Sequence, residues 1–179
     1  MTDMEASPAL TPAPELASER LILRGPRRED LSEFTRFVTS APSMIAQGEA
    51  GTAADAWYAF LAGIGHWQWH GFGFFILEER ATGRSVGRVG LLKHVSWPET
   101  ELAWHLYEGA EGKGYATEAG RVVRDWAAAH LGVAQLYSFI DVNNTRSQAV
   151  ARRLQATTDG TRAAHDPEAE VWVHPRQAD

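Results

Sequence analysis

The chain is organised around the stretch from Glu99 to Asn144, of which residues 100–131 read TELAWHLYEGAEGKGYATEAGRVVRDWAAAHL. From Thr100 to Tyr107, apolar and polar residues alternate, which predicts a strand. From Thr117 to Leu131, apolar residues recur at helical spacing, and Gly132 is a suitable stop, which predicts a helix. The residues between these two segments form a glycine-rich turn that leads from the strand into the helix.

This turn is suited to binding an anion. Glycine allows a ligand to approach the backbone closely. The first N–H groups of a helix have no partner within the helix, and the helix dipole adds partial positive charge at the same end. The backbone N–H groups from Gly112 to Ala116 are therefore expected to bind a phosphate-bearing ligand.

Two common phosphate-binding motifs, the P-loop and the dinucleotide fingerprint, fit this turn less well than the motif considered in the next paragraph. A P-loop requires Ser or Thr after its Gly-Lys pair, but Lys113 is followed by Gly114. A dinucleotide fingerprint would begin with Gly112 and Gly114, yet Thr117 stands in place of its third glycine. Asp141 would be the ribose-binding acid, about thirty residues on where about twenty is usual. A dinucleotide-dependent oxidoreductase stays open on the glycine spacing alone.

Three segments together resemble one family. The segment Gly112–Ala119 (GKGYATEA) resembles the acetyl-CoA pyrophosphate loop of the GNAT N-acetyltransferases, in the version of their RimJ/RimL-like branch of ribosomal-protein N-acetyltransferases. Glu19–Arg24 (ERLILR), followed by Asp30, resembles the opening strand and first helix of that branch. Asn144–Ser147 (NTRS) resembles its Asn-x-x-Ser segment. The three segments occur in family order and span most of the chain.

This resemblance implies an α/β (α+β) fold with a central mixed, mostly antiparallel sheet flanked by helices. It implies that acetyl-CoA lies in a gap between two strands, which map here to Glu101–Tyr107 and Leu136–Asp141. The cofactor-binding residues that it implies are Trp104, His105, Leu106, Gly112, Lys113, Gly114, Tyr115, Ala116, Thr117 and Asn144.

The implied reaction is acetyl transfer from acetyl-CoA to a primary amine by direct attack. Glu101 matches the acid that often serves as general base in the family, because the attacking amine must lose a proton. His105 is an alternative base on the same strand face, since histidine titrates near neutrality. Ser147 is the expected hydrogen-bond partner of the departing thiolate. The expected acceptor is a protein N-terminus or a small-molecule amine.

The chain departs from the family pattern at several positions. Glu111 is an acid where many members carry Gln or Arg, and Ala151 replaces a tyrosine that many members use as the acid. Gln155-Ala156 replaces the usual Gly-Phe. These departures motivate a second hypothesis, a catalytically impaired CoA-binding regulatory module.

Composition limits the remaining possibilities. The chain has 179 residues, 44% of them hydrophobic, no cysteine and a formal net charge of −6. This composition predicts one domain from residue 18 to 179 after a flexible arm over 1–17. It excludes disulfides and a cysteine nucleophile. It favours neither nucleic acid nor membrane as a partner, and a cytoplasmic location is expected. A homodimer is possible.

No metal is expected, because His66 and His70 lack an evident third ligand. Trp67, Trp69, Trp97 and Trp104 are candidates for the acceptor pocket.

Outside the central stretch, patterning predicts further elements. Strands are expected over 20–24, 72–79, 85–93, 135–141, 157–162 and 170–174, the last two flanking a polar turn at 164–168. Helices are expected over 27–39, from an N-cap at Thr52 to residue 63 or 67, and over 145–154. A loop is expected over 41–51.

Overall fold

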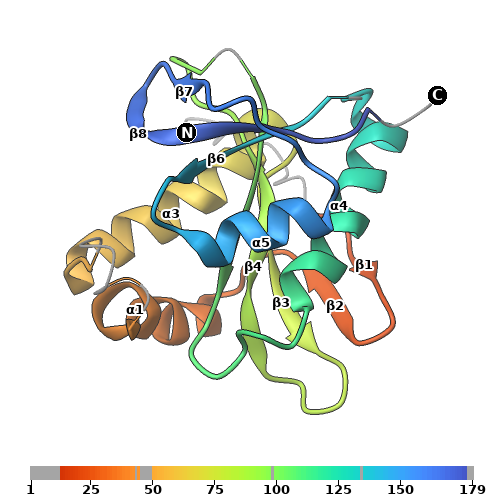
Figure 1. Cartoon of the computed structure of the whole chain (residues 1–179). Coiled ribbons are helices and arrows are strands. Elements are labelled where there is room, and N and C mark those ends of the chain that lie inside the picture. The colour runs from red at the N-terminus through yellow and green to blue at the C-terminus, as the bar shows by residue number, and fades with distance from the viewer. Residues whose placement is uncertain (1–12, 43, 45–49, 98, 134, 177–179) are drawn as a thin grey trace, which may run out of the picture.

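The computed structural model describes residues 13–42, 44, 50–97, 99–133 and 135–176. Its centre is an eight-stranded sheet in the order β1-β2-β3-β4-β5-β6-β8-β7 (Figure 1). The strands are β1 (Leu16–Ala17), β2 (Leu21–Arg24), β3 (Phe74–Glu79), β4 (Ser85–Leu92), β5 (Glu101–Leu106), β6 (Tyr137–Asp141), β7 (Arg162–Ala163) and β8 (Asp166–Val173). Neighbouring strands are antiparallel except β5 and β6, which are parallel.

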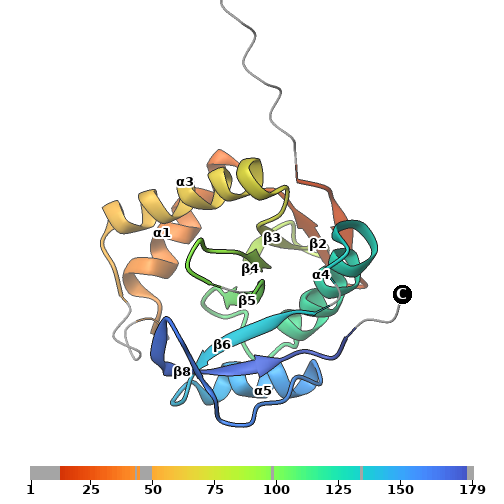
Figure 2. The same ribbon diagram turned by 90° about the horizontal axis from the view of Figure 1, so that it is seen from above.

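Helices cover both faces of the sheet (Figure 2). The short 3-10 helix η1 (Arg28–Asp30) leads into α1 (Leu31–Ser40), which packs with α3 (Ala53–His70) on one face. The helices α4 (Tyr115–Leu131) and α5 (Thr145–Arg153) lie on the other. The largest apolar cluster joins α4 to β2–β5 and includes Leu21, Leu77, Val89, Leu102, Ala119 and Val123. Successive side chains of a strand point to opposite faces. Leu102, Trp104 and Leu106 therefore face α4, whereas Glu101, Ala103 and His105 face α1 and α3.

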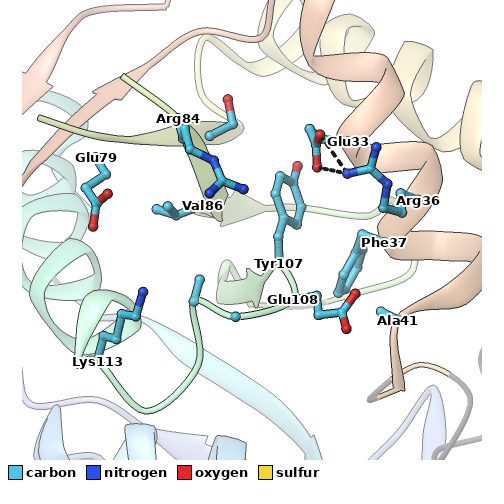
Figure 3. Close-up of a pocket in the computed structure, with 13 residues that line it drawn as sticks. Glu33, Arg36, Phe37, Ala41, Glu79, Arg84, Val86, Tyr107, Glu108 and Lys113 are labelled. Atoms are coloured by element: carbon cyan, nitrogen blue, oxygen red, sulfur yellow. Dashed lines mark hydrogen bonds and ion pairs between the residues drawn. The ribbon is translucent and has the colours of Figure 1, made fainter. Parts of the chain in front are cut away.

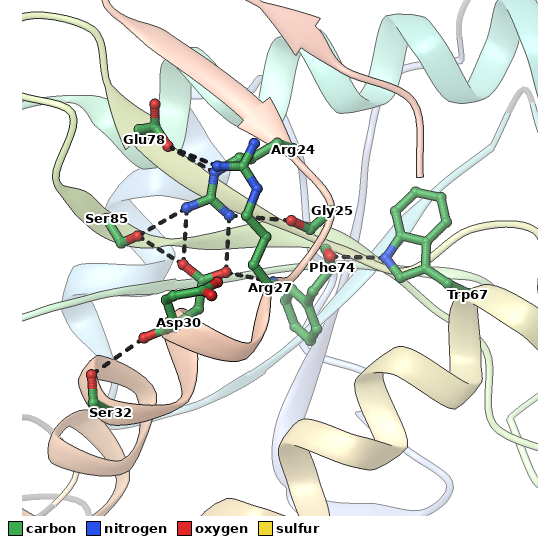
Figure 4. A network of polar contacts seen from close by, with 10 residues as sticks. Arg24, Gly25, Arg27, Asp30, Ser32, Trp67, Phe74, Glu78 and Ser85 are labelled. Atoms are coloured by element: carbon green, nitrogen blue, oxygen red, sulfur yellow. Dashed lines mark hydrogen bonds and ion pairs between the residues drawn. The ribbon is translucent and has the colours of Figure 1, made fainter. Parts of the chain in front are cut away.

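A buried ion-pair network fixes the turn from β2 into α1 (Figure 4). The Arg24 guanidinium donates two hydrogen bonds to Asp30, each 2.9 Å long, and one of 2.7 Å to Glu78. Ser85 donates to Asp30 at 3.1 Å. Burial alone would raise the pKa of Asp30, but hydrogen bonds led by that from Arg24 outweigh burial and lower it. Because removing one partner would leave a buried charge unpaired, the network makes this turn rigid.

The predicted elements are largely confirmed, with three differences. The α4 helix starts two residues earlier than predicted, at Tyr115, and α3 continues to His70 because only Gly71, at a φ of 72°, ends it. Thr52 caps α3 as predicted, since its hydroxyl accepts the Asp55 N–H at 3.2 Å.

The third difference concerns the two ends of the chain. Leu16–Ala17 of the predicted arm pairs with β2 as a strand, while residues 1–12 of the arm lie outside the described part. The predicted polar turn at 164–168 is limited to residues 164 and 165, because β8 already begins at Asp166. The strand predicted over 157–162 is wrong, because Thr157 forms only an isolated bridge with Val173 and β7 starts at Arg162. Most of the predicted loop at 41–51 also lies outside the described residues.

Candidate active site

The parallel strands β5 and β6 separate almost as soon as they meet. Glu101 and Tyr137 form the only register pair between them among the described residues, and the Tyr137 N–H donates to the Thr100 carbonyl at 3.1 Å. By contrast, β4 and β5 pair over six positions, and β6 and β8 over five. The gap that was predicted between Glu101–Tyr107 and Leu136–Asp141 is therefore present and opens beyond Glu101.

Two side chains end the β5–β6 ladder. In an uninterrupted parallel ladder, the Phe139 N–H would next donate to the Leu102 carbonyl. Instead the Ser138 hydroxyl donates to the Leu102 carbonyl at 2.5 Å, and the Phe139 N–H donates to a Glu101 carboxylate oxygen at 3.4 Å. Because both backbone groups are satisfied by side chains, the strands can part without leaving them unpaired.

The edge of β5 that lines the gap carries free backbone groups. The Thr100 and Leu102 carbonyls both point toward β6, and the direction of these groups alternates along a strand with a period of two. The backbone N–H and C=O groups of Trp104 and Leu106 therefore also point into the gap, where β6 no longer pairs with them. They can form hydrogen bonds with an extended ligand that contains amide groups, as a further strand would.

Glu101 lies at the point where the strands part, on the face toward α1 and α3. It is 8% exposed. Burial raises its pKa to about 7, against the smaller lowering by the hydrogen bond from Phe139. A carboxylate with this pKa is half-ionised near neutral pH, which suits a general base. The Trp97 and His165 rings stack on each other and both meet Phe139 edge-on, with centroids 4.6–5.7 Å apart. Because Phe139 donates to Glu101, this cluster lies beside the carboxylate.

Trp104 and Ser147 meet on the other face. The Trp104 indole N–H donates to the Ser147 hydroxyl at 3.2 Å, linking β5 to the first turn of α5 across the gap. Asn144 caps α5, because its side-chain oxygen accepts the Ser147 N–H at 3.0 Å. The Ser147 hydroxyl accepts a hydrogen bond from Trp104, so its own proton is free to be donated. Asn144 thus has a clear structural role in placing Ser147.

The glycine-rich turn has the backbone geometry of an anion cradle. Gly112 and Gly114 have φ angles of 75° and 85°, which side-chain-bearing residues rarely adopt. Gly114 is the N-cap of α4 and provides no side-chain cap, so the N–H groups of Tyr115, Ala116 and Thr117 have no intrahelical acceptor. The Glu111 carboxylate turns back and accepts the Gly109 N–H at 3.1 Å. Glu111 thus holds the loop in place.

A pocket of about 220 Å³ lies on the α1 side of this loop (Figure 3). Its lining includes Lys113 from the turn, Arg84 from the β3–β4 hairpin, and Glu33 and Arg36, which pair with each other at 2.8 Å. The buried Tyr107 hydroxyl has no hydrogen-bond partner among the described residues. The pocket contains neither Glu101 nor Ser147, so it adjoins the glycine-rich turn and not the point where β5 and β6 part.

His105 does not lie where a cofactor contact was expected. Its side chain points to the α1 face, between Phe37 and Phe74 at ring distances of 5.5 and 5.4 Å, and its backbone faces β4. Only its neighbours Trp104 and Leu106 line the gap. The prediction of His105 as a cofactor residue therefore lacks geometric support, because strand alternation sends its side chain to the opposite face.

The candidate pocket tryptophans separate into different environments. Trp67 is core, with its N–H donated to the Phe74 carbonyl at 2.9 Å, and Trp69 is 85% exposed. Only Trp97 and Trp104 lie near the site. His165 and Phe139 were missed by the sequence reasoning, and no local signal marks them, since β8 and β6 bring them together from distant segments.

The C-terminal departures are accommodated by packing. Ala151 is fully buried in a cluster with Ile140, Ala156 and Trp172, against which Trp104 packs. A tyrosine would not fit there without displacing this cluster. Gln155 has a φ of 65°, a conformation that glycine adopts without strain. The backbone at the position of the expected glycine therefore suits a glycine, although the chain carries glutamine there.

In the described part of the chain, no group of three or more His, Cys, Asp or Glu side chains is placed to hold a metal ion. His66 instead accepts the Lys93 N–H at 3.0 Å and contacts the Phe72 carbonyl at 2.7 Å. No helix of the described residues is both long and apolar enough to cross a bilayer.

Comparison with known proteins agrees with this geometry. Residues 20–157 match the acetyltransferase (GNAT) domain family, and the chain belongs to that family of acyltransferases. An acetyltransferase structure from Agrobacterium tumefaciens is 32% identical, with a TM-score of 0.84 over 98% of this chain and 99% of that one.

Two more distant structures share the fold. A GNAT-family acetyltransferase from Bacillus anthracis is 16% identical, with a TM-score of 0.71 over 89% of this chain and 96% of that one. The ribosomal-protein α-N-acetyltransferase RimL, in complex with coenzyme A, is also 16% identical, with a TM-score of 0.72 over 90% of this chain and 97% of that one.

Proposed function

We propose that this protein is an N-acetyltransferase that transfers the acetyl group of acetyl-CoA to a primary amine by direct attack. The observation that carries this proposal is the coincidence of three features at one gap. These are the free backbone edge of β5, the glycine cradle at the start of α4, and a buried carboxylate, Glu101, with a pKa of about 7.

The chain offers a separate group for each part of acetyl-CoA. The pyrophosphate fits the N–H groups from Gly112 to Thr117, and the amides of the pantetheine arm fit the backbone of Trp104 and Leu106. The arm would then end near the point where β5 and β6 part. Because the family resemblance and the local geometry indicate the same gap, and the same residues apart from His105, we assign the cofactor to this gap.

Glu101 is proposed as the general base. Amines are mostly protonated at neutral pH, with pKa values of about 8 for an α-amine and about 10 for lysine. Glu101 accepts the proton, directly or through a water molecule, as the amine nitrogen bonds to the thioester carbonyl carbon. Collapse of the resulting tetrahedral adduct breaks the carbon–sulfur bond.

Ser147 is proposed to stabilise the departing thiolate. Its hydroxyl proton is free, because the oxygen accepts the Trp104 N–H. A serine hydroxyl is too weak an acid to protonate the thiolate fully, so a hydrogen bond is its expected contribution. The missing tyrosine at Ala151 is consistent with a mechanism in which solvent finally protonates the thiolate.

Thermal unfolding with acetyl-CoA, NAD and ATP in parallel tests the cofactor. A ligand at 100 times its dissociation constant adds about 2.7 kcal/mol to the free energy of unfolding. Stabilisation by acetyl-CoA alone is expected. Stabilisation by NAD without an effect of acetyl-CoA would overturn the proposal and favour the dinucleotide-binding alternative.

Turnover over a broad panel of primary amines then separates the enzyme from a CoA-binding regulatory module. The departures at Glu111 and Gln155 motivated that second hypothesis. In the structure, Glu111 is bonded to its own loop and Gln155 has a backbone conformation that suits glycine, which favours the enzyme. CoA binding without any turnover would favour the module.

A further inference from the structure

The sheet face that carries the Glu101 side chain also carries the positive charge of Arg88, which has no counter-charge among the described residues. Arg88, on β4, is the register partner of His105. Its guanidinium lies 4.2 Å from the ring centroids of both Phe34 and Phe74. Among the described residues, no carboxylate forms an ion pair with Arg88. Burial lowers its pKa to about 10, so Arg88 remains charged near neutral pH.

Arg88 fixes the hydrogen-bonding state of His105. The Arg88 Nε–H donates to His105 Nδ1 at 3.0 Å. Because an arginine N–H can only donate, His105 Nδ1 must be the acceptor and the imidazole proton must lie on Nε2. Burial and the charge of Arg88 both lower the pKa of His105. His105 is therefore a neutral N–H donor, and it is not suited to be the alternative base.

The Nε2–H of His105 has no acceptor among the described residues, and the charge behind it makes it a stronger donor. A hollow lined by Arg88, Pro26, Phe34 and Phe60 has a volume of only about 10 Å³. That is room for about one water molecule. A larger ligand group therefore does not fit beside Arg88 in this hollow, and the Nε2–H of His105 is the donor that this charge polarises.

We infer that His105, backed by Arg88, binds a carboxylate of the amine acceptor. The inference rests on the proposed function, because it places the acceptor on the Glu101 face of β5. An anionic oxygen is the partner that a charge-backed N–H favours, and the pair would give Arg88 the counter-charge that its surroundings lack. Arg88 is the positioning residue, and His105 makes the contact.

The strand sets the length of the acceptor. Glu101 and His105 are four residues apart, which corresponds to about 13 Å along β5. A hydrogen bond of about 3 Å at each end leaves about 7 Å between the amine nitrogen and the carboxylate. An α-amino acid is too short to span this distance. A chain of about five methylene groups, or an acidic side chain near a peptide N-terminus, is long enough.

The probes are ω-amino carboxylates with one to seven methylene groups, each paired with its neutral carboxamide. Thermal unfolding of the CoA-bound protein measures their binding without requiring turnover. We expect 6-aminohexanoate to stabilise the complex at concentrations at least tenfold lower than its carboxamide, while glycine and glycinamide do not differ. Equal effects of acid and amide at every length would overturn the inference.

Variants assign the effect to these two residues. Arg88→Met keeps an apolar stem between the two phenylalanine rings, and His105→Phe removes the donor. Each should abolish the preference for the acid and raise the KM for acidic acceptors about tenfold, with kcat and the KM for amides little changed. Arg121→Met, at an exposed arginine of α4, is the matched control. A preference that persists in Arg88→Met would contradict the role of Arg88.

The state of His105 can be observed separately by imidazole ¹⁵N resonances. At neutral pH they should report a neutral ring with its proton on Nε2 in the wild type, because burial and the charge of Arg88 lower the pKa of His105. A protonated ring at neutral pH, or a proton on Nδ1, would overturn the inference even if both variants failed to fold. Loss of acetyl-CoA stabilisation would instead count against the proposed function, which these probes do not test.

Discussion

Arg20 is bonded to both ends of the cradle, and its main partner is Glu118. Its guanidinium lies 2.6 Å from the Glu118 carboxylate and donates to the Lys113 carbonyl at 3.0 Å. Glu118 also accepts the Arg20 backbone N–H at 2.9 Å and the Ser18 hydroxyl at 2.7 Å. The opening strand motif and the loop motif are thus directly bonded to each other, although 98 residues separate them in the chain.

The first prediction concerns this junction. Glu118→Ala should weaken acetyl-CoA binding several-fold, because the loop from Lys113 into α4 loses its anchor on β2. The free energy of unfolding should fall by about 1 kcal/mol, the usual size for partly exposed charged hydrogen bonds. Calorimetric titration with acetyl-CoA measures the first effect. Glu33→Ala, in the exposed Glu33–Arg36 pair, is the control and should leave affinity unchanged. Unaltered affinity in Glu118→Ala would show that the anchor is not needed.

The second prediction concerns the base. Glu101→Gln should lower kcat by about 10²- to 10⁴-fold while acetyl-CoA affinity stays the same. In the wild type, kcat should fall as the pH drops below about 7, because the protonated carboxyl cannot accept a proton. This limb of the pH profile should be absent in the variant, and Asp125→Asn, at an exposed acid of α4, should retain it. An unchanged kcat at saturating substrate would remove Glu101 from the mechanism.

The third prediction is that the same substitution stabilises the fold. Because folding raises the pKa of Glu101 from 4.5 to about 7, the native state loses stability as the pH rises through this window. The loss is complete above pH 7 and amounts to as much as about 3 kcal/mol. Glu101→Gln removes this penalty, so its melting temperature at pH 8 should exceed that of the wild type. At pH 4 the two should melt alike. A lower melting temperature at pH 8 would mean that the carboxylate stabilises the fold.

The fourth prediction concerns the opposite titration, at His174. This residue is 1% exposed, its Nε2 lies 2.9 Å from the Ser138 hydroxyl, and its Nδ1 has no partner in the described part of the chain. Burial, aided by the charge of Arg124, lowers its pKa from 6.5 to about 4. The unfolded state therefore binds the proton first, and stability is lost as the pH falls from 6.5 towards 4, by up to about 3 kcal/mol. Urea denaturation of Glu101→Gln between pH 4 and 7 measures this slope together with the contributions of His105 and His70, whose pKa values burial also lowers. Adding His174→Gln should make the slope less steep, whereas adding His94→Gln at an exposed loop should leave it unchanged.

The fifth prediction concerns the turn after α5. Gln155 is exposed and adopts a positive φ, which glycine tolerates without strain. Gln155→Gly should therefore stabilise the protein by up to about 1 kcal/mol, net of the greater freedom of glycine in the unfolded chain. Arg153→Gly, in the last turn of the helix, should destabilise it by a similar amount. Chemical denaturation of both variants provides the comparison, and destabilisation by Gln155→Gly would show that the glutamine side chain has a stabilising contact.

The sequence alone was sufficient for those parts of the fold that local patterns specify. Alternation along Thr100–Tyr107 predicted which side chains share a face, and the glycines predicted the cradle. Three features depended on tertiary contacts instead. Ser138 ends the β5–β6 ladder only because Leu102 lies opposite, and Arg88 polarises His105 only because β4 pairs with β5 in that register. Trp97 meets His165 through a turn whose bounds were predicted wrongly. None of these relationships has a signature within a single segment.

The single register pair between β5 and β6 also has a mechanical consequence. The sheet consists of two well-hydrogen-bonded halves, β1–β5 and β6–β8, and side chains complete the seam between them. A cofactor arm that bonds to the free edge of β5 would act as a removable strand at this seam. Substrate binding and the joining of the two half-sheets are then one event, and the amides of β6 should exchange their hydrogens more slowly once the gap is filled.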